Sequence, residues 1–142
     1  MKIKKLYVFP QKKSEKVEVE EFFIFESQGI KGDASFGEEE RHVTLMSQDV
    51  LDRVEKDKEK GICLKRYKYN VLLDDIDLSK LKVKDKLPLG SGEIELIQRK
   101  ECKVPDCPLS KERCPIKDLP LFAKVVSSGK VKKNENLEIE NR

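Results

Sequence analysis

A strong net charge and a long apolar run are both missing from this sequence of 142 residues. The 30 Lys and Arg residues nearly balance the 27 Asp and Glu residues, which leaves a formal net charge of +3. This balance excludes a strongly basic nucleic-acid footprint and an acidic tail. No apolar run approaches the ~20 residues that a membrane-spanning helix needs. We therefore expect neither a nucleic acid nor a membrane as a partner.

Cysteine and histidine are scarce, with four cysteines and one histidine. Four cysteines are too few for a disulfide scaffold, and three of them, Cys102, Cys107 and Cys114, lie within thirteen residues. The apolar stretch near the N-terminus ends after Phe9, which is too short for a secretory signal. We therefore expect a cytoplasmic protein whose clustered cysteines serve metal or thiol chemistry.

Apolar residues alternate with polar ones over most of the chain, which is typical of strands. Val17 and Val19 alternate with glutamates ahead of the apolar run 22–25, for example. Residues 26–40 break the pattern with three glycines and a run of three glutamates, which predicts a long loop of the kind that often carries function. Strands are expected at 3–9, 16–25, 41–46, 94–96 and 137–139.

One segment has a helical pattern instead. Ser47 is expected to cap a helix over residues 48–60, and Gly61 to follow its end. The segments 82–89 and 132–139 echo each other as turns that lead into strands. Many short strands and one helix predict a mainly β (α+β) fold, a small closed or partly open β-barrel formed by a single domain over 1–142.

The loop segment Gly29-Ile30-Lys31-Gly32-Asp33 is the first candidate for chemistry. Its glycines allow positive φ and a close approach to a ligand, Lys31 can meet a phosphate, and consecutive amides can bind an anion. It is not a Walker loop, because the Gly-Lys-Ser/Thr ending is missing and a strand follows. An ordinary surface loop would contain the same residues.

Arg41 begins the strand expected at 41–46. If Val43 and Leu45 face the core, the two-residue period places Arg41 on the same inward side, where its guanidinium needs an anionic partner. His42 would then point outward, and we expect an exposed strand histidine rather than a catalytic base. The basic and aromatic residues of 66–70 suggest base stacking, but in a nearly neutral chain they predict a strand entrance with half-buried tyrosines.

Cys102 has Arg99, Lys100 and Lys103 beside it, and nearby positive charge favours the thiolate, which is both a nucleophile and a metal ligand. The spacing Cys-x4-Cys-x6-Cys is not a standard zinc pattern. Three readings of the cluster stay open: a metal site completed by Cys63 or His42, an iron–sulfur cluster, or a set of free thiols.

Taken in order, these segments resemble the MOSC domain of molybdenum-cofactor sulfurases and of small free-standing bacterial proteins. The segment 29–33 is similar to the family's Gly-hydrophobic-x-Gly-Asp loop, and 41–45 to its Arg-Gln-Val-Ser-Leu strand. Arg66 and Asn70 match its Arg-x3-Asn stretch, and Cys102 its signature cysteine.

The resemblance continues with 122–125, which is similar to a downstream motif, and it covers roughly residues 28–140. There are departures: Asp75 replaces a familiar glycine, Lys103 a common histidine, Phe36 is unusual in the loop, and Asn134 replaces a turn glycine. The change at Asn134 is mild, because asparagine tolerates positive φ.

The resemblance implies a barrel-like fold that binds molybdenum cofactor (molybdopterin) through its phosphate. Asn70 would orient this site, and Asp33 would fix the turn of the loop or pair with Arg41. The residues implied for cofactor binding are Lys31, Gly32, Asp33, Arg41, Arg66 and Asn70.

Cys102 is implied either as a sulfur carrier, which would hold a persulfide for cofactor sulfuration or metal–sulfur cluster assembly, or as a ligand of molybdenum. The first role makes the protein sulfurtransferase-like. The second makes it a molybdenum-dependent reductase of N-hydroxylated compounds. The chain has no pyridoxal-phosphate site, so sulfur would come from a partner cysteine desulfurase. Other implied partners are the cofactor's biosynthetic and acceptor proteins.

The alternative of another class is a non-catalytic zinc-binding or interaction module that uses Cys102, Cys107 and Cys114.

Overall fold

The computed structural model describes residues 1–11, 15–38, 42–57, 69–97 and 121–137. Their strands are β1 (Lys2–Val8), β2 (Val17–Val19), β3 (Glu21–Phe25), β4 (Gly29–Ile30), β5 (Val43–Ser47), β6 (Val71–Asp74), β7 (Lys86–Leu89), β8 (Gly92–Ile97), β9 (Phe122–Ser127) and β10 (Gly129–Lys132). They also include the helix α1 (Gln48–Asp57) and a 3-10 turn (Leu78–Lys80).

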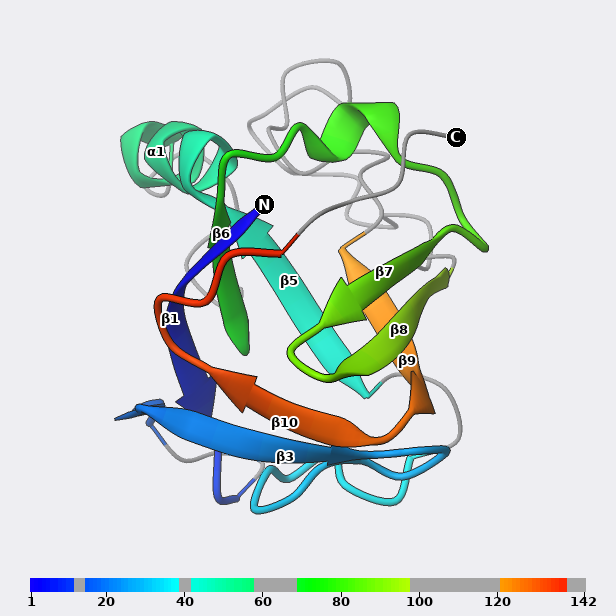
Figure 1. Ribbon diagram of the computed structural model, residues 1–142. Helices are drawn as coiled ribbons and strands as arrows, with labels where there is room; N and C mark the ends of the chain where they lie inside the picture. Colours follow the sequence, from blue (N-terminus) through cyan, green and yellow to red (C-terminus); the bar gives the residue numbers. More distant parts are fainter. Residues whose placement is uncertain (12–14, 39–41, 58–68, 98–120, 138–142) are drawn as a thin grey trace, which may run out of the picture.

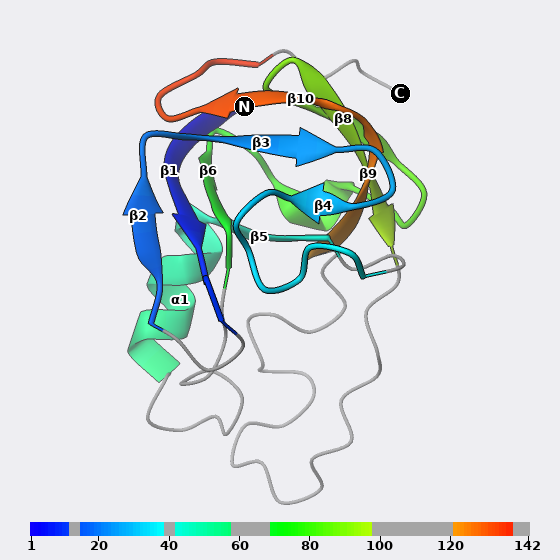
Figure 2. The same cartoon turned by 90° about the horizontal axis from the view of Figure 1, so that it is seen from below.

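The strands form two sheets that curve around one core (Figure 1). The larger sheet has the order β2-β1-β6-β5-β9-β8-β7, and the smaller one has the order β10-β3-β4. Figure 2 shows the smaller sheet lying across one side of the larger one. Of the described strand pairs, only β5 and β6 run parallel. The fold is therefore mainly β and partly open, with one short α-helix among the described residues, as the sequence predicts.

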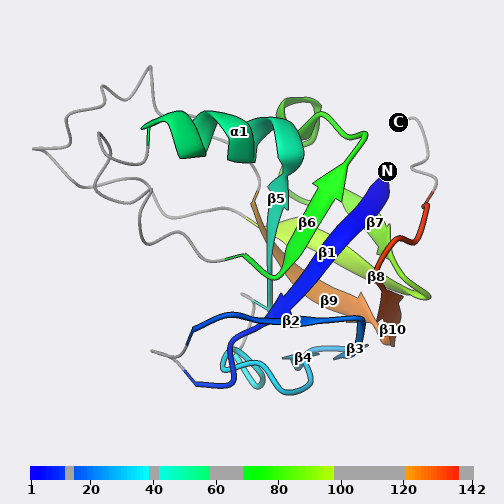
Figure 3. The same ribbon diagram turned by 90° about the vertical axis from the view of Figure 1, so that its left-hand side faces the viewer.

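The main apolar core lies between the two sheets. A second, smaller cluster lies on the other face of the larger sheet, where α1 packs on β5 and β6 (Figure 3). The main core contains Ile3, Leu6, Phe22, Ile24, Ile30, Val43, Leu45, Val71, Leu73, Leu87, Leu89, Ile94, Leu96, Ala123, Val125 and Val131. The second contains Met46, Val50, Leu72, Leu78 and Leu121.

Strand β5 is covered on both faces. Val43 and Leu45 point into the main core as predicted, while Met46 lies in the cluster beneath α1. The helix begins at Gln48 as predicted, and residues 58–60 of the expected helix lie outside the described residues. The cap predicted at Ser47 is wrong, because its buried Oγ atom makes no hydrogen bond within the described structure. The backbone of Ser47 pairs with β6 as a strand residue, and this pairing sets the direction of its side chain.

Two predicted segments have different boundaries. The strand expected at 16–25 is two strands, β2 in the larger sheet and β3 in the smaller one, separated at Glu20. The loop expected at 26–40 contains the short strand β4, which pairs with β3. Of the strand expected at 137–139, only Leu137 lies within the described residues.

The turns predicted from the echoed segments are present. Lys84 and Asn134 occupy the third position of each segment, and both have positive φ, 79° and 66°. Each donates its backbone N–H to a distant strand at 2.8 Å, Lys84 to the carbonyl of Leu96 in β8 and Asn134 to the carbonyl of Ile3 in β1. Asp75, which replaces a glycine of the family pattern, also has positive φ, 55°. These residues accept backbone conformations that favour glycine.

Candidate functional site

Asp33 is a buried carboxylate that anchors the glycine-containing loop. Its Oδ1 atom accepts hydrogen bonds from the backbone N–H of Phe9, at 2.8 Å, and from Asn70 Nδ2, at 3.1 Å. Its Oδ2 atom accepts from the N–H and the hydroxyl of Ser35, at 3.1 and 2.5 Å. These bonds hold the turn of the loop, and the implied role of Asp33 in cofactor binding stays a prediction. Its alternative partner, Arg41, lies outside the described residues.

Asn70 is buried beside Asp33 and joins three parts of the fold. Its Oδ1 atom accepts from the N–H of Thr44 on β5, at 3.0 Å. Its Nδ2 atom donates to the carbonyl of Tyr7 on β1, at 3.2 Å, as well as to Asp33. One amide side chain therefore holds β1, β5 and the loop together, so Asn70 can fix the position of the loop relative to these two strands. Sequence reasoning missed Tyr7 and Thr44, since backbone groups carry no residue signature.

The glycines of the loop adopt the backbone conformation that the sequence predicts. Gly29, Gly32 and Gly37 have φ of 112°, 90° and 95°. Gly32 is exposed, a Cβ atom built on it would meet nothing within 4 Å, and its N–H has no acceptor in the part of the chain that the structure describes. The backbone at Gly32 is therefore open to an approaching anion.

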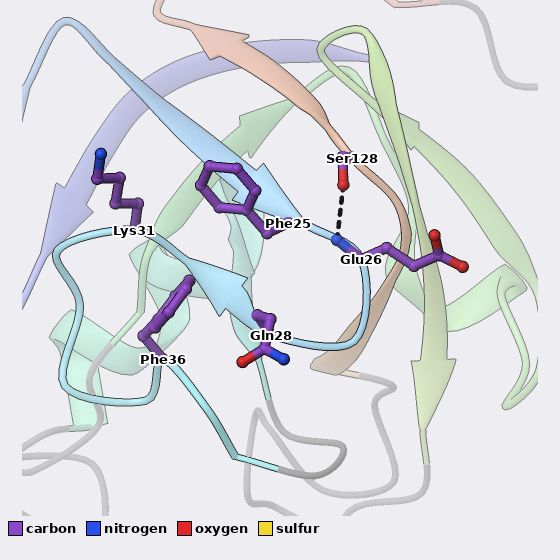
Figure 4. Close-up of a pocket in the computed structure, with 6 residues that line it drawn as sticks. All are labelled: Phe25, Glu26, Gln28, Lys31, Phe36 and Ser128. Carbon is purple, nitrogen blue, oxygen red and sulfur yellow. Dashed lines mark hydrogen bonds between the residues drawn. The ribbon is translucent and has the colours of Figure 1, made fainter.

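Lys31 lies away from the Asp33–Asn70 pair. Figure 4 shows it at the rim of a shallow hollow of about 520 Å³ on the outer side of β3 and β4. Phe25 and Phe36 form the apolar part of this hollow, and their rings meet edge to face with centroids 6.1 Å apart. The structure thus brings Asp33 and Asn70 together but places Lys31 on another face. Its predicted contact with a phosphate stays a prediction.

His42 is buried, so the prediction of an exposed histidine is wrong. Its Nδ1 atom accepts from the N–H of Val125 at 2.9 Å, and its Nε2 atom lies 2.6 Å from the carbonyl of Glu38. These partners require the neutral ring with the hydrogen on Nε2. Gly29 lies against the ring, where an added Cβ would be 3.2 Å from that of His42. The imidazole is therefore a structural link between β9 and the loop.

No family model matches the chain, and no curated protein matches its sequence. The YuaD protein of Bacillus subtilis matches its structure with a TM-score of 0.71 at 14% identity, covering 94% of this chain and 91% of YuaD. YiiM of Escherichia coli matches with a TM-score of 0.60 at 18% identity, covering 100% of this chain and 71% of YiiM.

YiiM of Geobacillus stearothermophilus gives a TM-score of 0.60 at 14% identity, covering 92% of this chain and 70% of that protein. The chain has a MOSC-like fold. At these identities the likeness concerns the fold alone. It agrees with the mainly β, barrel-like architecture that the motifs imply.

A pair of tyrosines covers the outer side of the MOSC-like fold next to Asn70. The rings of Tyr7 and Tyr69 pack edge to face with centroids 5.5 Å apart, and the Lys16 ammonium lies 4.6 and 5.6 Å from them. Burial, and then the nearby Tyr7 and Glu55, raise the pKa of Tyr69 to about 12. The half-buried tyrosine predicted here is confirmed at Tyr69.

The remaining candidates lie outside the described residues. Among the described residues, no three His, Cys, Asp or Glu side chains group as a metal site would require. In the same part of the chain, no helix has both the length and the apolar character needed to cross a membrane. The candidate residues outside the described ranges are Arg41, Arg66, Cys63, Cys102, Cys107 and Cys114.

Proposed function

We propose that this protein binds molybdenum cofactor and that Cys102 provides its working thiolate, either as a sulfur carrier or as a ligand of molybdenum. The observation that carries the proposal is the 3.1 Å hydrogen bond between Asn70 Nδ2 and Asp33 Oδ1. The two residues lie 37 positions apart, and the MOSC resemblance assigns them to one site. A chance match of short motifs has no reason to bring them together.

The described residues fit the phosphate of such a cofactor. A phosphate needs N–H donors and cations, and Gly32 offers an exposed amide without an acceptor in the described residues. The Asp33 carboxylate would otherwise repel an anion, but it is turned inward and hydrogen-bonded on both oxygens. In this proposal Arg41 and Arg66 add the positive charge, and Asn70 keeps the loop and β5 in register around the phosphate.

The thiolate of Cys102 suits either chemistry. Molybdenum is a soft metal that thiolates bind, and when bound the cofactor would supply the metal and its redox chemistry. For sulfur transfer, the Cys102 thiolate attacks the outer sulfur of a persulfide on a partner desulfurase. A sulfur–sulfur bond forms at Cys102 while the partner's cysteine leaves as a thiolate. Lys100 and Lys103 would stabilise the attacking thiolate.

Elemental and pterin analysis of the protein from a cofactor-competent host tests the binding. We expect molybdenum and pterin to copurify, and to fall by about ten-fold or more in Arg41→Ala and Arg66→Ala, because each removes a cation from the phosphate. Arg53→Ala is the matched control, because Arg53 is exposed on α1 and its one described ion pair is with Asp49, at 3.8 Å. Repeated absence of molybdenum, tungsten and pterin would contradict the proposal. So would stoichiometric zinc that survives dialysis and disappears in Cys107→Ser or Cys114→Ser.

Mass-mapped alkylation across pH tests the thiolate. Cys102 should react fastest of the four cysteines at neutral pH, because cations beside it favour the anion. Cys63, in an apolar stretch of the sequence, should react slowly. If Cys102 is the slowest of the four and stays inert after metal chelation, it is a core residue and the assignment is wrong.

A further inference from the structure

The outer face of the smaller sheet carries three exposed phenylalanines. Phe22 and Ile24 point into the core, so the alternation of β3 turns Phe23 and Phe25 outward. The exposed fractions are 46% for Phe23, 38% for Phe25 and 44% for Phe36, whose ring packs on Phe25. We call these three residues the phenyl face. Large apolar side chains gathered on one surface commonly mark an interaction site.

The charges around the phenyl face are of both signs. Lys130 lies opposite Phe23 in β10, with its ammonium 5.7 Å from the ring centroid and 3.0 Å from the carboxylate of Glu21. That cation is therefore already paired. Lys31 and Glu26 both line the hollow beside Phe25, and neither forms an ion pair with another described residue. Figure 4 shows the two side chains on opposite sides of Phe25.

We propose that the phenyl face binds a second copy of this chain through a two-fold axis close to Phe25. In a two-fold interface, each residue i that meets residue j of the other copy is matched by j meeting i. A cation and an anion on opposite sides of an apolar centre satisfy that rule. Lys31 of each copy then lies against Glu26 of the other, and the phenyl rings pack between the two ion pairs.

The same charges argue against a nucleic acid or an anionic membrane as the partner of the phenyl face. A single-stranded nucleic acid needs a groove of cations along its backbone, and an anionic membrane needs a basic cluster. The phenyl face instead has Glu21 and Glu26 beside Lys31 and Lys130. A polyanion would therefore meet carboxylates at the positions where it needs lysines.

The size of the surface predicts a reversible dimer. Three phenylalanines exposed to this degree present on the order of 250 Å² of ring. With a polar rim, an interface built on this patch would bury roughly 1,000 Å² of accessible surface in total, which is typical of weak complexes that dissociate on dilution. The dimer should therefore form and dissociate within an accessible concentration range. Its formation does not depend on cofactor binding.

Sedimentation velocity of the full-length protein over a concentration series tests the proposal. We expect the wild type to shift from one chain to two as concentration rises. Phe25→Ser, Lys31→Glu and Glu26→Lys should each raise the dissociation constant by about ten-fold or more. The double variant Lys31→Glu/Glu26→Lys restores both ion pairs with exchanged signs and should return the constant to near the wild-type value. Val83→Ser is the control, because Val83 is exposed to a similar degree but lies outside the phenyl face.

Several results would overturn the proposal. One is a wild type that remains a single chain at every concentration, and another is a dimer that Lys31→Glu and Glu26→Lys leave unchanged. A double variant no better than either single one, with circular dichroism showing all of them folded, would also refute the Lys31–Glu26 pairing. So would a monomer that binds a single-stranded oligonucleotide or anionic vesicles in a Phe25-dependent manner.

Discussion

At the scale of single residues, the chain contains the same local turn twice in different surroundings. Asp33 accepts from the N–H and hydroxyl of Ser35, and Asp77 accepts from the same groups of Ser79, at 3.0 and 2.6 Å. Asp33 is buried and also holds Phe9 and Asn70, whereas Asp77 is exposed. The difference in stability lost on replacing each aspartate therefore measures the contribution of the bonds from Phe9 and Asn70 to Asp33.

Replacing these aspartates should separate the two contributions. Asp33→Ala should lower the free energy of unfolding by about 2–4 kcal/mol, because buried donors on Phe9 and Asn70 lose their acceptor. Asp77→Ala should have a clearly smaller effect, because water can replace the carboxylate at an exposed turn. Urea denaturation of both variants measures this, and equal losses would show that the bonds to Phe9 and Asn70 contribute nothing.

The residues of this network show how far sequence reasoning reached. Asp33 and Asn70 were identifiable because they belong to ordered motifs. The bonds of Asp33 to Ser35 agree with one of the two roles implied for Asp33, that of fixing the turn, and the role of both residues toward a cofactor stays a prediction. The burial of His42 was not predicted, because two-residue alternation assumes that one face of a strand meets water. Strand β5 has the core on one side and α1 or the loop on the other, so both faces are buried. No local pattern contains that information.

At the scale of elements, the turn between β7 and β8 crosses β10 with almost no space. Gly90 has a φ of 60°, and a Cβ atom added there would lie 2.1 Å from the carbonyl oxygen of Lys130. Gly37 also has positive φ, 95°, but a Cβ atom would meet nothing within 4 Å. Two glycines with similar backbone requirements thus differ in their packing.

Alanine substitutions at these glycines should therefore differ in cost. Gly37→Ala should lower the free energy of unfolding by about 1–2 kcal/mol, the cost of a left-handed conformation. Gly90→Ala adds a backbone clash that only a shift of β10 can relieve, so its loss should be larger, about 3–5 kcal/mol. Thermal and urea unfolding measure both. If Gly90→Ala is no worse than Gly37→Ala, the crossing is looser than these contacts indicate.

Element boundaries were predicted less well than element types. The segment 16–25 contained a signal that was not used: its apolar residues change phase between Val19 and Phe22. A strand that keeps one face on a core cannot change phase without a break, and the chain indeed passes from one sheet to the other at Glu20. The pairing of β4 with β3 had no comparable signal, because two residues are too few to show a period.

At the scale of the whole molecule, the mainly β, partly open fold followed from composition and alternation. The assembly of two sheets did not, because it depends on contacts between distant residues. The N-terminal ammonium, for example, donates to the carbonyl of Leu137 at 3.1 Å, which ties the start of β1 to the residues after β10. We therefore expect the described strands to unfold as one cooperative unit, whose free energy of unfolding can be followed as a function of pH.

The free energy of unfolding should fall in alkali because of Tyr69. Burial, followed by Tyr7 and Glu55, raises the pKa of its hydroxyl from 10.0 to about 12. The folded chain therefore keeps a proton that the unfolded chain has released, so the free energy of unfolding is retained below about pH 10 and declines as pH rises toward 12. Tyr69→Phe has no such proton and should decline less over this window. Because Tyr69 is partly exposed, the effect should be smaller than that of a fully buried group.

Urea denaturation at a series of pH values, for the wild type and Tyr69→Phe, measures the difference. Burial also raises the pKa of Tyr7, which is present in both proteins, so the difference between the two profiles reports Tyr69. Two profiles that run parallel from pH 10 to 12 would show that Tyr69 ionises as freely in the folded protein as in the unfolded chain.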